Sequence, residues 1–142
     1  MNSLDQYLAQ YAESHQNSTN KKIHFICVPL IMWTVLMLLD LVVLPLGTLA
    51  YVLVIVSFIF YHVIKTPILD SVLMIILSLA MIFTARYLND YRLMVAVSVF
   101  VAAWIGQFIG HKIEGKKPSF FQDLLFLLIG PMWILQSFKR KD

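Results

Sequence analysis

Four long apolar segments constrain the fold of this chain more than any other feature of its sequence. They cover about residues 23–44, 47–64, 68–85 and 93–110. Each has roughly the 17–25 residues that a helix needs to cross the hydrocarbon core of a bilayer. The chain has 142 residues, 60% hydrophobic and 13% charged, and a soluble domain of that size could not bury so much apolar surface. The sequence therefore predicts an all-α polytopic membrane protein with four transmembrane helices and a single domain.

The basic balance of the chain does not indicate a nucleic-acid partner. The pI is near 9.1, but no basic stripe is visible, so we attribute the charge to membrane orientation. The single cysteine, Cys27, excludes an internal disulfide. Residues 1–22 are polar and lack the apolar core of a signal peptide. Insertion is therefore expected to depend on the first apolar span.

The segment before the first span carries a helical stripe. The residues of the stripe are Leu4, Tyr7, Leu8 and Tyr11, at the spacing of one helix face. This pattern is typical of a cytoplasmic amphipathic helix lying at the membrane surface, and a helix packed on other protein segments fits it equally. The polar run from Asn17 to Asn20 should break this helix and cap the next one.

A fifth apolar segment, at about residues 120–138, differs from the four spans. It is interrupted by Gly130 and Pro131 and carries Asp123. We interpret it as a re-entrant or interfacial helix pair rather than a clean span.

Charge placement predicts the orientation. With four spans and a cytoplasmic N-terminus, Arg86 and Arg92 are the only basic loop residues that lie outside, which is the positive-inside bias. The lysines that lie inside are Lys21, Lys22, Lys65, Lys112, Lys116 and Lys117. The tail Lys139 to Lys141 joins them only if the fifth segment does not cross. In the same topology all four histidines, His15, His24, His62 and His111, lie at the cytoplasmic face.

Several polar residues near this face are candidates for chemistry. Nine residues of one straight helix would place His15 and His24 on opposite sides, so they can converge only if the chain bends between them. Gln107, His111 and Glu114 follow an i, i+4, i+7 spacing and share one helix face. Histidines together with a carboxylate are a ligand set that non-haem iron accepts.

Other polar residues have simpler interpretations. Asp40, near the outer end of the first span, is expected to be solvated or to pair with Arg86 or Arg92. His62 is expected to act as an interfacial hydrogen-bond partner or to contact Asp70. The tryptophans, Trp133 among them, are interpreted as lipid-facing or packing groups.

Two ordered blocks of polar residues resemble the Mpo-like membrane family, and the resemblance covers nearly the whole chain. The first block runs from His15 through Asn17, Asn20 and His24 to Pro29, and the second from Trp104 through Gln107, His111 and Glu114 to Pro118. The resemblance implies an iron(II)-dependent dioxygenase of fatty-acid α-oxidation. Its substrates would be a 2-hydroxy fatty acid and O2, its product a fatty acid one carbon shorter, and no 2-oxoglutarate would be needed.

The resemblance also implies roles for individual residues. His15, His24 and His111 occupy the histidine positions and Glu114 the carboxylate position of an Fe(2+) site, and all four would be catalytic. Asn17, Asn20 and Gln107 would orient ligands or hold the substrate headgroup. Some relatives carry a second histidine after the first, where this chain has Gln16, so the ligand count stays open. Ligation needs neutral histidines, so we expect activity to fall as the pH drops through roughly 6.

Two alternatives remain open. One is a zinc-dependent hydrolase of a lipid amide or ester with Glu114 as general base, and the other is a non-enzymatic membrane lipid-binding or scaffold protein. In each case we expect an integral protein of a bacterial inner membrane or the endoplasmic reticulum, with its site on the cytoplasmic side. The lipid bilayer is the expected partner, and a homo-oligomer is left open.

Overall fold

The structure is a computed structural model that describes residues 3–115 and 120–139, and for residues 120–126 only the course of the helix. These residues form six α-helices, which confirms the all-α prediction. The helices are α1 (Leu4–Glu13), α2 (Ser18–Asp40), α3 (Leu49–Val63), α4 (Ile68–Arg86), α5 (Arg92–Glu114) and α6 (Phe120–Lys139). A two-stranded antiparallel hairpin, β1 (Val43–Leu44) and β2 (Gly47–Thr48), links α2 to α3, and one 3-10 turn, η1 (Asn89–Tyr91), precedes α5.

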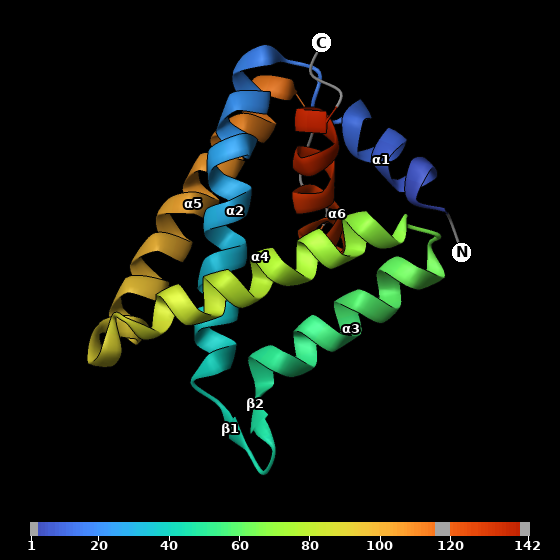
Figure 1. Cartoon of the computed structure of the whole chain (residues 1–142). Helices are drawn as coiled ribbons and strands as arrows, with labels where there is room; N and C mark the ends of the chain where they lie inside the picture. Colours follow the sequence, from blue (N-terminus) through green and yellow to red (C-terminus); the bar gives the residue numbers. More distant parts are fainter. Residues whose placement is uncertain (1–2, 116–119, 140–142) are drawn as a thin grey trace.

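Helix α2 is the element around which the others pack. It lies alongside α5 over most of its length and also contacts α3, α4 and α6. In Figure 1, α4 runs across α2 and α3 runs next to α4, while α1 and α6 lie together near the end of the molecule where α2 begins. That end therefore gathers segments that are far apart in the sequence.

Three described helices are long and apolar enough to cross a membrane, by length and composition. They are α2, α4 and the helical stretch Asn89–Glu114. The second predicted span, 47–64, is not confirmed as one, because α3 has only 15 residues, a rise of about 22 Å. The first predicted span, 23–44, overlaps α2, and residues 43–48 form the hairpin.

The apolar stripe of α1 packs on protein. Leu4, Tyr7, Leu8 and Tyr11 are all buried in one cluster with α6 residues such as Met132. The second interpretation of this helix is therefore the one that the structure supports. The backbone N–H of Leu4 also donates to the carbonyl of Ile64 at 2.7 Å, which ties the start of α1 to the end of α3.

Helix α6 runs without a break through Gly130 and Pro131, so the predicted helix pair is a single helix. Proline removes one backbone donor and would normally interrupt the hydrogen-bond ladder. The carbonyl that loses its helical donor is that of Leu127, four residues before Pro131. The neighbouring carbonyl, that of Leu128, accepts from the hydroxyl of Tyr61 at 2.8 Å, which ties α3 to this turn. The side chain of Asp123 lies outside the described residues, as do residues 116–119 and 140–142 with the lysines predicted there.

The opposite end of the bundle is joined by a buried carboxylate. Asp40 accepts from Nε and Nη2 of Arg86, each at 2.9 Å, and from Nη1 of Arg92 at 3.0 Å. The hydroxyl of Thr48 donates to the same carboxylate at 2.7 Å. The predicted pairing of Asp40 is confirmed, with both arginines at once, and it joins α2, α4, α5 and the hairpin.

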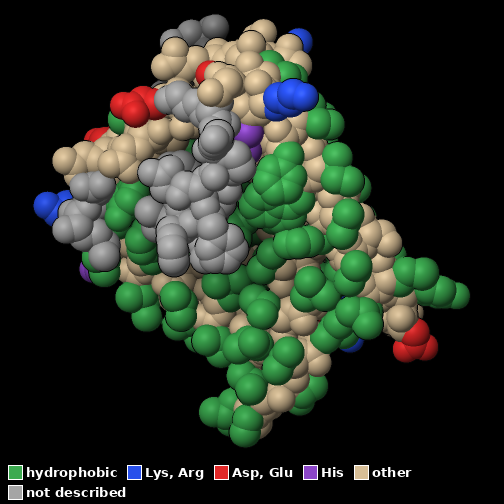
Figure 2. All heavy atoms as spheres, turned by 180° about the vertical axis from the view of Figure 1, so that it is seen from behind, with side chains coloured by type: hydrophobic (Ala, Val, Ile, Leu, Met, Phe, Trp, Pro, Cys, Tyr) green, Lys and Arg blue, Asp and Glu red, His purple; other side chains and the backbone are tan. Residues whose placement is uncertain are grey.

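The outer surface is largely apolar. In Figure 2, hydrophobic side chains cover the middle and lower parts of this face, while charged side chains gather at its upper part and at a few points along its edges. Exposed apolar residues such as Ile76 of α4 and Ile105 of α5 are more than half accessible. A surface of this kind is compatible with lipid contact.

Candidate active site

A sharp bend between α1 and α2 brings His15 next to His24. Helix α1 ends at Glu13, and α2 begins at Ser18, so His15 lies in the connection. The side chain of Asn17 caps α2 by accepting from the backbone N–H groups of Thr19 at 2.9 Å and Asn20 at 3.2 Å. A capped helix start of this kind fixes the direction in which the chain leaves the bend.

Two glycines on α5 let it approach α2 closely. A Cβ atom on Gly106 would lie 2.6 Å from Sγ of Cys27, so only glycine fits there. A Cβ atom on Gly110 would collide with Oδ1 of Asn20 and lie 3.2 Å from Cε1 of His24. This is the small-residue packing typical of membrane helices, and it places His111, one residue after Gly110, against the bend.

The three histidines converge from three different segments. The ring centres of His15 and His24 are 4.1 Å apart, those of His24 and His111 are 5.5 Å apart, and those of His15 and His111 are 6.2 Å apart. All three residues are buried, with 2%, 1% and 8% of their surface exposed in chain order. A compact cluster of buried imidazoles is thus present at the start of α2.

The hydrogen bonds of these rings determine their tautomers. Nδ1 of His15 contacts the carbonyl of Tyr11, and Nδ1 of His24 lies 3.0 Å from the carbonyl of Asn20. A carbonyl only accepts, so in the neutral ring each Nδ1 carries the proton and each Nε2 keeps its lone pair. Within the described residues, Nε2 of His15 and Nδ1 of His111 are buried without a hydrogen-bond partner.

Burial keeps His15 neutral. Loss of hydration is the main reason that the pKa of His15 is lowered to about 4. The Tyr11 carbonyl and Glu114 act in the opposite direction, and nearby His111 acts in the same direction as burial. The side chain is therefore uncharged at physiological pH. Neutral imidazole with a free lone pair is the form that binds metal ions.

Both carboxylate oxygens of Glu114 accept hydrogen bonds from the protein. Its Oε1 accepts from the backbone N–H of Asn17 and from Nδ2 of Asn20, both at 3.0 Å, and its Oε2 accepts from the backbone N–H of Gln16 at 3.3 Å. The carboxylate thus attaches the end of α5 to the bend that carries His15. Gly115, with φ of +79°, then ends α5.

Two predicted polar residues present unused acceptors to this cluster. Asn20 is fully buried, and its Nδ2 donates to the carbonyl of Ser14 at 3.2 Å as well as to Glu114. Two side-chain oxygens, Oδ1 of Asn20 and Oε1 of Gln107, are buried without a partner among the described residues. Buried acceptors normally bind a donor, so these two oxygens have capacity for a ligand or water.

Two aromatic side chains that were not predicted as part of the site, Tyr11 and Trp133, pack beside His15. The ring of Tyr11 stacks on His15 with centres 4.0 Å apart, and Trp133 of α6 lies 5.6 Å from His15 and 5.0 Å from Tyr11. Tyr11 precedes His15 by four residues, which is a weak signal in retrospect. No sequence pattern indicated Trp133, because its place depends on how α6 packs.

The fourth histidine does not join the cluster. His62 is exposed near the end of α3. Asp70, its predicted contact, instead accepts from Nε2 of Gln136 at 2.8 Å and from Nζ of Lys139 at 2.6 Å.

The imidazole groups of this cluster are chemically suited to bind a metal ion, although the described side chains are not arranged as a complete metal site. Among the residues that the structure describes, no group of three or more His, Cys, Asp and Glu side chains stands in a metal-binding arrangement. Imidazole nitrogens suit iron, zinc, copper and nickel, and two of the buried nitrogens here lack protein partners. Backbone carbonyls orient the rings of His15 and His24 in the manner common behind metal-bound histidines.

Comparisons with known proteins agree on one family. The sequence model described as "Mpo1-like: 2-hydroxy-palmitic acid dioxygenase Mpo1-like" matches residues 1–141. The chain is 31% identical over 143 aligned positions to the 2-hydroxy-palmitic acid dioxygenase MPO1 of Saccharomyces cerevisiae, covering 97% of this chain and 80% of that protein. No solved structure matches the chain. On these two matches, the chain belongs to the Mpo1-like family.

Proposed function

We propose that this protein is an iron(II)-dependent dioxygenase that converts a 2-hydroxy fatty acid and O2 to a fatty acid one carbon shorter. The atoms balance if the carboxyl carbon leaves as carbon dioxide and one molecule of water forms. The name of the yeast relative supports the substrate class. The observation that carries the proposal is the convergence of three buried imidazoles from α2, α5 and the bend before α2.

His15, His24 and His111 would hold the ion. Ferrous iron supplies the one-electron chemistry that lets oxygen react with a closed-shell organic acid. Burial keeps the ring of His15 neutral, and backbone carbonyls orient the rings of His15 and His24. It surrounds them with Tyr11 and Trp133, which exclude water from the side of His15.

Polar residues around the histidines would position the substrate. Oδ1 of Asn20 and Oε1 of Gln107 are buried acceptors without a partner among the described residues, and they could accept from the 2-hydroxyl group. Glu114 and Asn17 hold the bend that carries His15, so their role would be to fix the site rather than to react. Exposed Lys21 and Lys112 would attract the substrate carboxylate toward this end.

The same proposal places the site at the cytoplasmic face of a membrane. The ends of α2, α4 and α5 that meet at Asp40 carry Arg86 and Arg92, whereas the lysines lie at the other ends of these helices. Asn89→Cys and Lys112→Cys variants, both at exposed positions, should react with an impermeant thiol reagent from opposite sides. Reaction from the same side would contradict this orientation.

A zinc hydrolase is less well supported by the geometry. Its general base would be Glu114, but that carboxylate already accepts from Gln16, Asn17 and Asn20. No feature of the described residues specifically favours the hydrolase or a purely structural role.

An oxygen-consumption assay tests the proposal. Purified protein is loaded with iron(II) without air and mixed with a 2-hydroxy fatty acid, and air is then admitted while oxygen and the shortened acid are measured. His111→Ala should abolish turnover, and His62→Ala, at an exposed histidine outside the cluster, should retain it. Turnover retained in His111→Ala, or absent from the unmodified protein, would overturn the proposal.

A further inference from the structure

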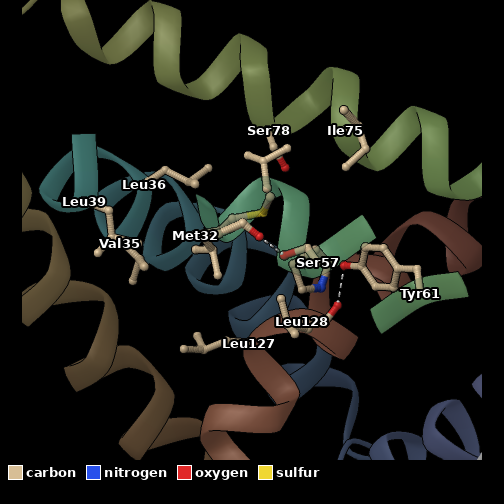
Figure 3. Close-up of a pocket in the computed structure, with 13 residues that line it drawn as sticks. Met32, Val35, Leu36, Leu39, Ser57, Tyr61, Ile75, Ser78, Leu127 and Leu128 are labelled. Atoms are coloured by element: carbon tan, nitrogen blue, oxygen red, sulfur yellow. Dashed lines mark hydrogen bonds between the residues drawn. The ribbon is translucent and has the colours of Figure 1, made fainter. Parts of the chain in front are cut away.

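A cavity of about 280 Å³ lies among α2, α3, α4 and α6, deeper in the bundle than the histidines. Its wall is mostly aliphatic. Figure 3 shows Leu36 and Leu39 of α2, Ile75 of α4 and Leu127 of α6 around the space, with Tyr61 at one end. Four helices thus enclose an apolar space inside the part of the protein that is expected to lie within the membrane.

The few hydroxyl groups in this wall already have partners. Ser57 and Ser78 each donate to the carbonyl four residues earlier in their own helix, at 2.7 and 2.8 Å. Tyr61 donates to the carbonyl of Leu128 at 2.8 Å. Among the described residues the wall therefore offers no free hydroxyl donor to an occupant, and an apolar group is what these residues can accept without an unsatisfied hydrogen bond.

The cavity and the histidine cluster lie along the same face of α2. His24, Val28, Met32, Leu36 and Leu39 follow spacings of three and four residues, so their side chains share one side of the helix. Met32, the first of these to line the cavity, comes eight residues after His24, about 12 Å further along the axis. A linear molecule with its polar end at the histidines would point its tail toward the cavity.

A layer of buried side chains reaches from one site to the other. Tyr11, Val28, Tyr61 and Trp133 belong to a single buried cluster, in which Tyr11 and Trp133 lie against His15 and Tyr61 lines the cavity. Gly130 completes the layer, and a Cβ atom there would lie 3.0 Å from Val28 and 3.1 Å from the Tyr11 hydroxyl. The barrier between cavity and site therefore consists of side chains, and Gly130 of α6 adds none to it.

We propose that this cavity binds the distal part of the substrate's acyl chain and so limits the chain length that the site accepts. The proposal rests on the proposed function for the identity of the polar end. Three observations support it: the wall is aliphatic, its described hydroxyl groups already donate to backbone carbonyls, and the cavity and the histidines lie along the same face of α2.

Photolabelling of the full chain tests this assignment. The probe is a 2-hydroxy fatty acid with a diazirine at its methyl end, bound to protein in phosphatidylcholine nanodiscs, irradiated and mapped by mass spectrometry of peptides. Label should appear between Met32 and Leu39 of α2 and around Ile75 of α4, and unlabelled 2-hydroxy acid should reduce it. Label confined to lipid-facing residues such as Ile105, or unaffected by the competitor, would overturn the proposal.

A matched pair of variants tests the volume of the cavity. Ser57→Phe places a ring in the cavity, whereas Ser98→Phe places one on the exposed face of α5. The first should reduce cavity labelling at least tenfold and shift turnover toward shorter 2-hydroxy acids, and the second should change neither. Equal labelling and equal chain preference in the two variants would overturn the proposal, and the map of the unmodified protein decides it if Ser57→Phe does not fold.

Failure of this inference differs from failure of the proposed function. Turnover of 2-hydroxy acids with label only on the outer surface would refute the chain site alone. Competed label in the cavity with no turnover of any 2-hydroxy acid would refute the dioxygenase and leave the chain site standing.

Discussion

His15, His24 and His111 sit close together, but their ring nitrogens are engaged in different ways. Backbone carbonyls fix the rings of His15 and His24, whereas Nδ1 of His111 is buried without a partner in the described structure. His111 is instead placed by its helix, next to Gly110. Two of the rings thus depend on the bend before α2, and the third depends on the packing of α5.

Glu114 is the residue that links these two supports. Glu114→Ala would remove the acceptor for two backbone N–H groups of the bend and for Asn20. Loss of partners behind metal ligands commonly lowers metal affinity about 10–100-fold, so we expect a loss in that range for iron. Iron affinity measured by anaerobic titration checks this.

Glu114→Gln is the matched control. It keeps a carbonyl oxygen that can accept from Asn17 and Asn20, so its iron affinity should lie between those of the unmodified protein and Glu114→Ala. If both variants lost iron completely, Glu114 would be a direct ligand and not a positioning residue.

The stability of the iron-free protein should depend on pH through His15. Its pKa is 6.5 when unfolded and about 4 when folded, so the unfolded chain takes up the proton first. Stability is therefore fully present above pH 6.5 and falls as the pH drops toward 4, by about 3 kcal/mol in total. For the folded iron-free protein, protonation of this ring lies below the pH of roughly 6 expected for an ordinary histidine.

Thermal unfolding in detergent at a series of pH values measures this effect. His15→Asn has no titratable group at this position, so its midpoint should decline less over the same interval. An identical decline in both proteins would contradict the assignment to His15.

At the scale of elements, the close contact between α2 and α5 is the feature on which the site depends. Gly106→Ala would press a methyl group against Sγ of Cys27, at 2.6 Å before any adjustment. Overpacking of this kind typically destabilises by about 1–3 kcal/mol. Adding Cys27→Ala should restore much of that stability by making room, as measured by thermal unfolding, and a double variant no better than Gly106→Ala would contradict the packing.

The helices could be predicted from the sequence to different degrees. The stripe of Leu4 to Tyr11 and the run that became α4 were predicted because their periodicity and hydropathy are local properties. The start of α2 was predicted from the capping residues between Asn17 and Asn20, and Asn17 is its N-cap. The apolar span alone starts later, because Lys21 and Lys22 lower the hydropathy of the first turns without breaking the helix. The short length of α3 was not predicted, because the hairpin before it also contains apolar residues and the sequence does not show where the helix begins.

The candidate site was predictable in its histidines but not in its contacts. A bend between His15 and His24 and the shared face of Gln107, His111 and Glu114 follow from spacing and helix geometry, although the bend lies just before Ser18 and not between Asn17 and Asn20. The hydrogen bonds of Glu114 to a segment about 97 residues away do not, since they depend on which helices become neighbours. The stacking of Tyr11 and Trp133 around His15 has the same origin.

Across the whole molecule, the two ends of the bundle have separate tasks. One end carries the histidines, and the other is held by Asp40 between Arg86 and Arg92. Asp40→Ala should destabilise the protein by about 2 kcal/mol, less than a fully buried pair would, because both arginines reach solvent in part. Iron affinity of the folded fraction should not change, and a parallel loss of iron would show that the two ends are coupled.

The claim that one iron ion is held by three imidazoles is tested most directly by X-ray absorption at the iron edge, on protein loaded without air. We expect imidazole scattering from three rings, falling to two in His24→Ala and unchanged in His62→Ala. An iron spectrum that is the same in His24→Ala, or a protein that binds no iron at all, would contradict it.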